Sequence, residues 1–519
     1  MTLRVGFLER PLPFHLLLAP MALPLVLTSA NIYIIPLTAA LRSIIVGWAV
    51  VLTLWAALTR ITGNARTSAL FVTLMIFGFF ADSAVDTVAG PARPAAALLT
   101  WCVLLALGLT ILRFGREVRG LTVVANLFFL ILCASPCLGI ARFELARPVA
   151  VVRRPHLEAL SVNATQSLAA LPDVYLFVLD GYGRADVLRE LYGYDDTLVR
   201  RLRAAGFYVA DLGSSNYAQT ALSLASSLNL DYVPALTDQI ASDSASRRPL
   251  MSLIRENLTF RTFSRAGYRI VTFASEYGMV RFDGADQECR PWLYLTDFEY
   301  SLYDASALPR LSMLAGLSRA WLPHQIRRHY VWWTLDRLSK PVTASDGRPT
   351  LVFVHLMLPH PPFTFRADGT YTWTNLPAGL FDGDHWRTVQ RQSDEGYEAG
   401  YLGNIRFLDG QFAPIIETIL ARASRPTAIL IQGDHGPGAR LAWNDPSASN
   451  MKERLGILLA MRLPDGDSAA LYPTITPVNA TRVLLNRVLG TSLPLLDDRS
   501  WFSTWPRPYL FHDVTAQVR

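Results

Sequence analysis

Residues 1–141 contain apolar runs that limit the fold of this chain more than any other feature. The runs lie at 14–35, 39–59, 68–89, 95–112 and 121–141. Each is long enough to cross, as a helix, the hydrocarbon layer of a membrane, which is about 30 Å thick. A helix satisfies its own backbone hydrogen bonds in lipid, whereas irregular backbone does not. The sequence therefore predicts a transmembrane domain of five helices over 1–141.

The first run could be a signal peptide, but four similar runs follow it, which favours a membrane anchor. Segments expected to face the cytoplasm carry Arg4, Arg10, Arg60, Arg66, Arg113, Arg116 and Arg119, whereas the two loops expected outside carry only Arg42 and Arg93. Positive residues mark the cytoplasmic side. We therefore expect a multi-pass protein of the inner (plasma) membrane. Its part after residue 141 should face the periplasm or the extracellular side.

The charge balance and the cysteines exclude some classes of protein. The formal net charge is +6, and this excess comes largely from arginines beside the apolar runs, so nucleic acid is not an expected partner. Of the four cysteines, only Cys289 lies beyond residue 141. The outer part is therefore expected to have no internal disulfide and no cysteine-based zinc site. No feature indicates an obligate protein partner.

Residues 142–172 have the mixed composition typical of a linker, and from 173 onward strand-like runs alternate with segments of helical periodicity. We expect strands at 174–180, 207–211, 268–274, 350–358, 427–432 and 456–463, and helices at 184–205, from about 220, and at 251–266, 394–422 and 478–490. This alternation predicts an α/β domain over 173–519 with a mostly parallel central sheet covered by helices. In such sheets ligands bind at the carboxyl ends of the strands.

Several expected strands end in side chains that can bind a metal or move a proton. Asp180 ends the strand in LFVLDGYGR, Asp434 and His435 follow the strand in AILIQGDHGPG, and His360 follows a strand in the proline-rich PHPPF. Two carboxylates and an imidazole suit one divalent ion, with Zn or Mn the leading choices. The structural alternatives are a turn-forming Asp-Gly, a polar strand end and a stiffened loop.

A polar loop supplies a candidate nucleophile. In SSNYAQTALSLASSLN, Thr220 is expected at the first turn of a helix, where backbone N–H groups favour an anion. A hydroxyl beside a metal loses its proton more easily, and a metal near a helix N-terminus suits a phosphate or sulfate ester. Ser214, Ser215 and Ser223 are rival nucleophiles, and Thr220 could instead simply begin the helix.

These motifs, in this order, resemble the alkaline phosphatase/sulfatase superfamily. The match of DGYGR, the threonine loop, PHPPF and GDHG runs from about 173 to 490. With the apolar runs before it, the chain is most similar to the membrane-anchored, sulfatase-like branch, which includes lipoteichoic acid synthases, phosphoethanolamine transferases and phosphoglycerol transferases. The resemblance implies an alkaline phosphatase-like fold and one metal held by Asp180, Thr220, Asp434 and His435. It also implies a substrate-side or acid–base role for His360.

Two departures from the family pattern limit the reactions that the chain is expected to catalyse. No histidine lies between Gly436 and Leu463, so a complete second metal site is not expected. No Cys or Ser stands in the C/S-x-P-x-R pattern of formylglycine sulfatases. The resemblance therefore implies a phosphotransferase that uses Thr220 and modifies a lipid or a cell-envelope glycan. A phosphodiesterase or phosphatase, and a metal-free pseudoenzyme acting as an envelope scaffold, are the alternatives.

Two further side chains give weaker signals. Arg454 lies just before the expected strand at 456–463 and could bind the substrate anion, although charged side chains in such places are usually solvated. His355 lies within the expected strand at 350–358, so we interpret it as a core residue rather than a site residue.

Overall fold

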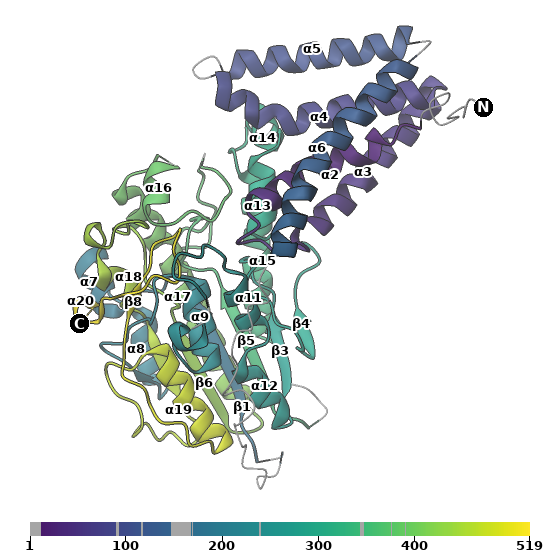
Figure 1. Ribbon diagram of the computed structural model, residues 1–519. Coiled ribbons are helices and arrows are strands. Elements are labelled where there is room, and N and C mark those ends of the chain that lie inside the picture. Colours follow the sequence, from purple (N-terminus) through teal and green to yellow (C-terminus); the bar gives the residue numbers. More distant parts are fainter. Residues whose placement is uncertain are drawn as a thin grey trace. The chain divides into compact units, whose positions relative to one another are not determined.

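The computed structural model describes residues 12–89, 93–115, 118–146, 168, 170–237, 240–342, 347–374, 376–389 and 391–518. Most of the linker expected at 142–172 lies outside these residues, as do Arg4, Arg10 and Arg116 and the side chain of Arg93. Contacts between residues divide the chain into two units (Figure 1). We call them the helical unit (Met1–Pro148, Asp297–Pro323 and Thr374–Gly379) and the sheet unit (Val149–Thr296, His324–Trp373 and Leu380–Arg519).

The helical unit contains the apolar helices. They are α2 (His15–Ala30), α3 (Ala39–Thr62), α4 (Ala65–Ala89), α5 (Arg93–Phe114) and α6 (Arg119–Ala146). Among the described residues, four helices are long and apolar enough to cross a membrane: α3 to α6. The first expected span, at 14–35, forms the 16-residue α2 followed by turns. The number of spans therefore stays a proposal, whereas an apolar helical part before an α/β part is confirmed.

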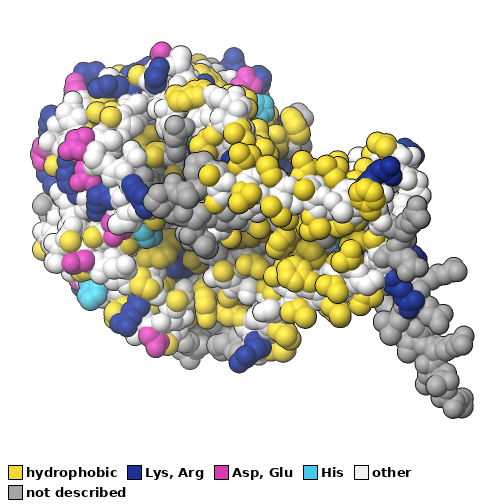
Figure 2. Space-filling view, turned by 90° about the horizontal axis from the view of Figure 1, so that it is seen from above, with side chains coloured by type: hydrophobic (Ala, Val, Ile, Leu, Met, Phe, Trp, Pro, Cys, Tyr) yellow, Lys and Arg dark blue, Asp and Glu magenta, His cyan; other side chains and the backbone are white. Residues whose placement is uncertain are grey.

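Large apolar side chains are exposed on the helical unit. On α3, Ile45 and Val46 are exposed, and so are Leu98 and Leu99 on α5. On the face seen in Figure 2, hydrophobic side chains cover much of the helical unit. Helices that pack only against one another in water bury such side chains. This surface is therefore suited to lipid.

Two short helices beyond residue 141 belong to the helical unit, which the sequence did not indicate. They are α13 (Asp297–Asp304) and α14 (Leu308–Leu314). Phe298 of α13 is buried in a cluster with Ile35, Ala40 and Ile44. The side chain of Glu299 also forms an ion pair with Arg42, with Arg42 Nη2 at 2.6 Å from Glu299 Oε1. The boundaries expected from composition therefore do not describe every contact.

The sheet unit is built on a seven-stranded sheet in the order β2-β7-β6-β1-β5-β3-β4. The strands are β1 (Asp173–Leu179), β2 (Tyr208–Val209), β3 (Arg269–Phe273), β4 (Gln287–Cys289), β5 (Thr350–Leu356), β6 (Thr427–Gln432) and β7 (Leu459–Arg462). All neighbouring pairs from β6 to β4 are parallel, and only the pairs β6–β7 and β7–β2 are antiparallel. Buried apolar side chains fill the central strands, as both faces of a parallel sheet require. The mostly parallel sheet is confirmed.

Helices cover both faces of this sheet. In the register of β1 with β5, Phe177 pairs with Val354, so Phe177 and Phe353 point to opposite faces. Phe412 of α17 (Asp394–Arg422) contacts Phe177, with ring centroids 5.1 Å apart, whereas Phe260 of α12 (Leu258–Arg265) contacts Phe353, at 5.5 Å. The two contacts place α17 and α12 on different faces. Other helices of the unit are α8 (Thr197–Ala204), α9 (Thr220–Asn229), α10 (Val233–Leu236), α15 (Trp321–Leu338), α16 (Asp384–Thr388), α18 (Met451–Leu455), α19 (Pro477–Leu489) and α20 (Thr515–Val518).

Two expected helices are each broken in two. The segment 184–205 forms α7 (Ala185–Tyr192) and α8, because Gly193 ends α7 with a φ of 60°. The segment 251–266 forms α11 (Arg248–Arg255) and α12, which Asn257 caps by accepting a hydrogen bond from the Phe260 N–H. In contrast, α9 begins at Thr220 and α17 spans 394–422, as expected.

Candidate metal centre

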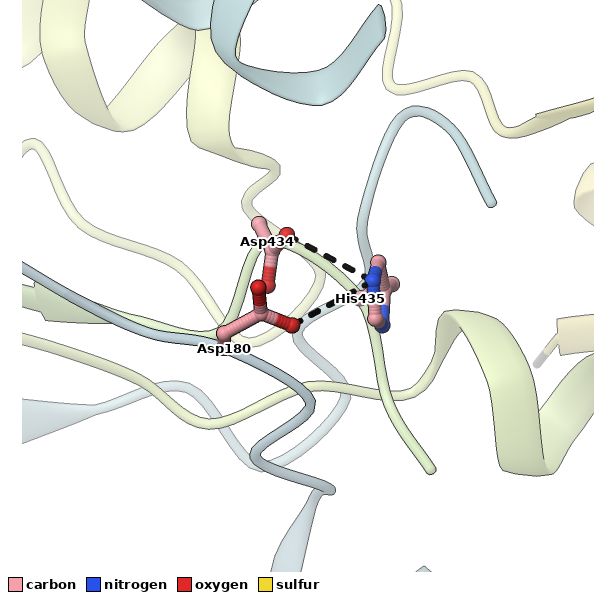
Figure 3. A group of neighbouring side chains, drawn as sticks. All are labelled: Asp180, Asp434 and His435. Carbon is pink, nitrogen blue, oxygen red and sulfur yellow. Dashed lines mark ion pairs between the residues drawn. The ribbon is translucent and has the colours of Figure 1, made fainter. Parts of the chain in front are cut away.

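Three of the predicted ligands converge at the carboxyl end of the sheet. Asp180 follows β1 directly, and Asp434 and His435 follow β6 after Gly433. Because β1 and β6 are neighbouring parallel strands, their carboxyl ends meet at the same edge. One ligand atom from each of the three residues lies within 4.8 Å of the others. His435 Nε2 is 3.5 Å from Asp180 Oδ1 and 3.5 Å from Asp434 Oδ2 (Figure 3).

Three of the four carboxylate oxygens of this site have no hydrogen-bond donor among the described residues. Asp180 and Asp434 are 1% and 0% exposed. Among the described residues, no side chain or backbone group donates a hydrogen bond to Asp180 Oδ1, Asp180 Oδ2 or Asp434 Oδ2. Only Asp434 Oδ1 accepts one, from the Gly181 N–H at 3.2 Å. Buried carboxylates without donors are strongly unfavourable unless a cation neutralises them. The residues therefore fit a divalent cation.

The hydrogen bond of His435 shows which ring nitrogen faces the carboxylates. His435 Nδ1 lies 2.9 Å from the Gly436 carbonyl oxygen, which can only accept, so Nδ1 carries the proton. Nε2 then presents its lone pair to Asp180 and Asp434. Burial, followed by the charge of Arg454, lowers the pKa of His435 to about 3. A neutral nitrogen and two carboxylates facing one point form an oxygen-and-nitrogen ligand set.

Thr220 is the predicted nucleophile whose hydroxyl reaches this point. It is the first residue of α9, is half-buried, and its Oγ1 lies 3.2 Å from His435 Nε2. The rival Ser215 is buried and its hydroxyl donates to the Asp434 carbonyl oxygen. Ser223 is also buried and faces Ser215 at 3.4 Å, whereas Ser214 faces Ser500 at 3.4 Å.

The glycines around Asp434 and His435 are needed for close packing. Neither Gly433 nor Gly436 has a positive φ, so a left-handed backbone is not what requires glycine here. A Cβ on Gly433 would lie 2.5 Å from the Tyr182 carbonyl oxygen, and one on Gly436 would lie 2.2 Å from that of Glu453. Any side chain would push the loop away from its neighbours and displace the two ligands.

His360 lies beside the three ligands and not among them. It follows β5, and its ring centroid is 6.1 Å from that of His435. Its Nδ1 donates to the Pro361 carbonyl oxygen at 2.6 Å, and its Nε2 lies 3.8 Å from Asp382 Oδ2. Arg327 fixes the backbone by donating to the His360 carbonyl oxygen at 3.3 Å. His360 Nε2 is therefore held near the three ligands, with the Asp382 carboxylate close to it.

Arg454 is buried and does not lie on an open surface. Its Nη1 is 2.6 Å from Asp382 Oδ2 and 3.1 Å from the Gly436 carbonyl oxygen, and its Nε donates to the Ala218 carbonyl oxygen at 2.9 Å. Burial acts to raise the pKa of Asp382, but the charge of the Arg454 guanidinium holds it below its ordinary range. Arg454 therefore connects the His435 loop, the loop before α9 and Asp382.

Sequence reasoning missed two side chains of this site. Asp382 lies in a segment with no strand or helix pattern, so nothing in its sequence context indicates a role. His355, interpreted as a core residue, is fully buried on β5, but its Nε2 lies 3.3 Å from Asp180 Oδ2 and its Nδ1 lies 2.8 Å from Ser275 Oγ. Its pairing with Val178, two residues before Asp180, places it on the face of Asp180. Strand register is the signal that could have found it.

Comparisons with known proteins give structural neighbours only. No family model and no curated protein sequence matches the chain. The periplasmic domain of EcEptC from Escherichia coli, in complex with Zn, is 11% identical; the match covers 70% of this chain and 98% of that one, with a TM-score of 0.41. The membrane protein lipooligosaccharide phosphoethanolamine transferase A from Neisseria meningitidis is 14% identical, with 91% and 95% covered and a TM-score of 0.40.

The phosphonate monoester hydrolase of Agrobacterium radiobacter is also 14% identical, with 64% of this chain and 80% of that one covered and a TM-score of 0.38. The neighbours are thus phosphoethanolamine transferases, sulfatases and a phosphonate hydrolase. These are the kinds of protein that the sequence motifs resemble. At such scores the neighbours say nothing about the reaction of this chain.

Proposed function

We propose that this chain is a membrane-anchored, metal-dependent phospho-group transferase of the sulfatase-like type. One observation carries the proposal. The Thr220 hydroxyl lies 3.2 Å from a neutral His435 nitrogen, and that nitrogen faces two buried carboxylates. Three of their four oxygens have no donor among the described residues. A hydroxyl beside such a ligand set is the arrangement of an activated nucleophile.

Asp180, Asp434 and His435 would hold the ion, with the Thr220 hydroxyl beside them as the predicted fourth ligand. A divalent ion there, with Zn or Mn the leading choices, favours loss of the hydroxyl proton and neutralises charge on phosphate oxygens. The start of α9 adds backbone N–H groups that have no partner within the helix. Both features favour an anionic ester at Thr220.

The residues suggest one sequence of bond changes. Thr220 Oγ1 attacks phosphorus of a phosphodiester; the Thr220 oxygen–phosphorus bond forms, the bond to the leaving oxygen breaks and the hydroxyl proton is lost. His360, whose Nε2 lies 3.8 Å from Asp382 Oδ2, is placed to give a proton to the leaving oxygen. An acceptor alcohol then attacks the same phosphorus and the Thr220 oxygen–phosphorus bond breaks. The alcohol proton passes to His360, and the Thr220 oxygen regains from solvent the proton it lost to solvent in the first step. Arg454 would support this site indirectly, by holding Asp382 and the Gly436 carbonyl in place. Because it is buried, its guanidinium could bind the substrate anion only after the surrounding side chains move.

The four long apolar helices support a membrane-embedded enzyme, and such an anchor suits a lipid or an envelope glycan as substrate. We infer a multi-pass protein of the inner (plasma) membrane, with the sheet unit facing the periplasm or the extracellular side. A hydrolase would pass the same phospho-group to water, and a pseudoenzyme would bind no metal.

The experiment uses full-length protein in detergent and vesicles of phosphatidylethanolamine or phosphatidylglycerol as donors. We expect bound metal in the parent, and lipid turnover that rises when an acceptor glycan or lipid is added. Asp434→Asn and His435→Ala should lose metal and turnover by orders of magnitude. Thr220→Ala should lose turnover but keep weaker metal binding, while Ser223→Ala is the matched control. Full metal content and turnover in all three site variants would contradict the proposal.

A further inference from the structure

The short helix α14 exposes an apolar surface that no other described residue covers. Leu311, Met313 and Leu314 are 51%, 45% and 77% exposed. They lie in LPRLSMLAGL (308–317), which has a single charged residue, Arg310. A contiguous apolar surface of this kind marks a binding surface for a protein or a membrane.

The position of α14 along α4 indicates which of these it meets. The Ala307 N–H, just before α14, donates to the Phe79 carbonyl oxygen at 2.8 Å, and the Ser83 hydroxyl donates to the Ala305 carbonyl oxygen at 3.1 Å. Phe79 lies within the apolar segment Ala65–Ala84 of α4. At 1.5 Å per residue, Phe79 is roughly 8 Å inside the end of that segment. The chain before α14 is therefore bonded to α4 within a stretch that is long and apolar enough to cross a membrane.

Arg310 forms an ion pair with a buried carboxylate of α4, Asp82. Its Nε lies 3.0 Å from Asp82 Oδ2, and Asp82 Oδ1 also accepts a hydrogen bond from Trp101 Nε1 at 2.9 Å. Asp82 is buried, and a carboxylate within an apolar span has to be paired. The cation of α14 thus neutralises an anion of α4, and the apolar residues of α14 stay outside the pair.

The segment is closed on itself, so its apolar side chains are presented as a unit. The Tyr303 hydroxyl lies 3.0 Å from Ser312 Oγ and donates to the Arg319 carbonyl oxygen at 2.9 Å. The Leu317 N–H donates to the Ser312 carbonyl oxygen at 2.9 Å. These bonds satisfy polar groups within the segment, as irregular backbone near lipid requires.

We propose that residues 305–317 dip into the outer leaflet of the membrane, with Leu311, Met313 and Leu314 in contact with lipid acyl chains. The segment is hydrogen-bonded to α4, which is itself apolar. Its one charged side chain, Arg310, pairs with Asp82. The segment is an additional membrane contact made by chain that lies far beyond the last apolar helix. It stands independently of the reaction at Thr220.

The test measures membrane depth at Leu314 in the full chain. Cys102, Cys133, Cys137 and Cys289 are first replaced by Ala, and Leu314→Cys is then labelled with a nitroxide and reconstituted in phosphatidylcholine vesicles. Accessibility to oxygen, which concentrates in lipid, is compared with accessibility to a water-soluble nickel complex. Val46→Cys, on the exposed face of α3, and Asp195→Cys, whose side chain is 75% exposed, give the lipid and water limits.

We expect the label at 314 to be accessible to oxygen and protected from nickel, several-fold closer to the label at 46 than to the one at 195. Arg310→Ala, which leaves Asp82 without its cation, should shift the label at 314 toward the water limit. A label at 314 that is as accessible to nickel as the one at 195 overturns the proposal. Protection from both reagents would also overturn it, because that result indicates cover by protein. Met313→Cys repeats the measurement if the first variant does not fold.

Discussion

His355 lies beside the Asp180 carboxylate and is placed to orient it. The nearest polar side-chain atom of β5 is His355 Nε2, 3.3 Å from Asp180 Oδ2. The Ser275 hydroxyl lies 2.8 Å from His355 Nδ1, and when it donates there, the imidazole proton is on Nε2 and faces Asp180. At 3.3 Å this N–H faces Asp180 Oδ2 without making a hydrogen bond to it in the structure, and a partner at this place can orient a ligating carboxylate. We therefore propose His355 as a positioning residue for Asp180.

Replacing His355 should weaken metal binding without removing a ligand. We expect His355→Ala to lower the affinity for Zn about 10- to 100-fold, measured by competition with a chelator on the full-length protein in detergent. His355→Gln keeps a donor toward Asp180 and should recover part of the affinity. His385→Ala, a histidine outside the site, is the matched control. An unchanged affinity in His355→Ala would show that Asp180 does not need it.

At the scale of single residues, the sequence predicts site residues that lie just after a strand. It misses site residues that reach the site from segments without a strand or helix pattern. The convergence of Asp180, Asp434 and His435 could be predicted because they follow recognisable buried strands, Asp180 directly and the other two after Gly433. Asp382 reaches Arg454 and His360 from a segment without regular pattern. Its place depends on long-range packing, which no local signal encodes.

Two buried carboxyl groups, one at the start of α8 and one in α17, both contact the Tyr182 hydroxyl. Asp196 caps α8 and Asp409 lies within α17, and both are buried. The Tyr182 hydroxyl is 2.8 Å from Asp409 Oδ1 and 3.2 Å from Asp196 Oδ1, and the Tyr194 hydroxyl donates to Asp409 Oδ2 at 2.6 Å. Burial and then the charge of Asp196 raise the pKa of Asp409 to about 7, and burial raises that of Asp196 to about 6.

This pair should make stability depend on pH. A carboxyl whose pKa is raised on folding stabilises the fold fully below its unfolded pKa, about 4, and this contribution is lost as pH rises through its folded pKa. We expect the free energy of unfolding to fall as pH rises from about 4 to about 7, by several kcal/mol from this pair. Asp409→Asn should flatten this dependence, while the exposed Asp195→Asn should not. Denaturant unfolding followed by intrinsic fluorescence checks both, and equal slopes in all three proteins would contradict the assignment.

At the scale of elements, periodicity predicts the existence of helices better than their breaks. The run 184–205 has helical periodicity throughout, but it breaks at Gly193 because that residue adopts a left-handed φ of 60°. The start of α9 at Thr220 could be predicted because a polar loop ends there. The attachment of α13 could not be predicted, because Phe298 finds its apolar partners 263 and 254 residues away in sequence, at Ile35 and Ile44.

At the scale of the whole molecule, residues 297–323 show which helix ends of the helical unit lie on the same side. They contact Ile35 and Ile44 near the turn between α2 and α3, and Phe79 near the end of α4. These contacts place the end of α2, the start of α3 and the end of α4 on one side of the bundle. The arginine pattern predicts these same ends to face outward. Composition could predict the helical and sheet parts, but not that the later part of the chain returns to the helices.

The measurement that tests the central claim most directly is the phosphorylation of Thr220 itself. Full-length protein is incubated without acceptor, with whichever lipid donor it consumes, quenched in acid and digested, and the peptide that contains Thr220 is analysed by mass spectrometry. We predict a phosphorus-containing adduct on Thr220 that disappears when acceptor is added and is absent in Asp434→Asn. Continued turnover by Thr220→Ala, with no adduct on Thr220 in the parent, would contradict the account.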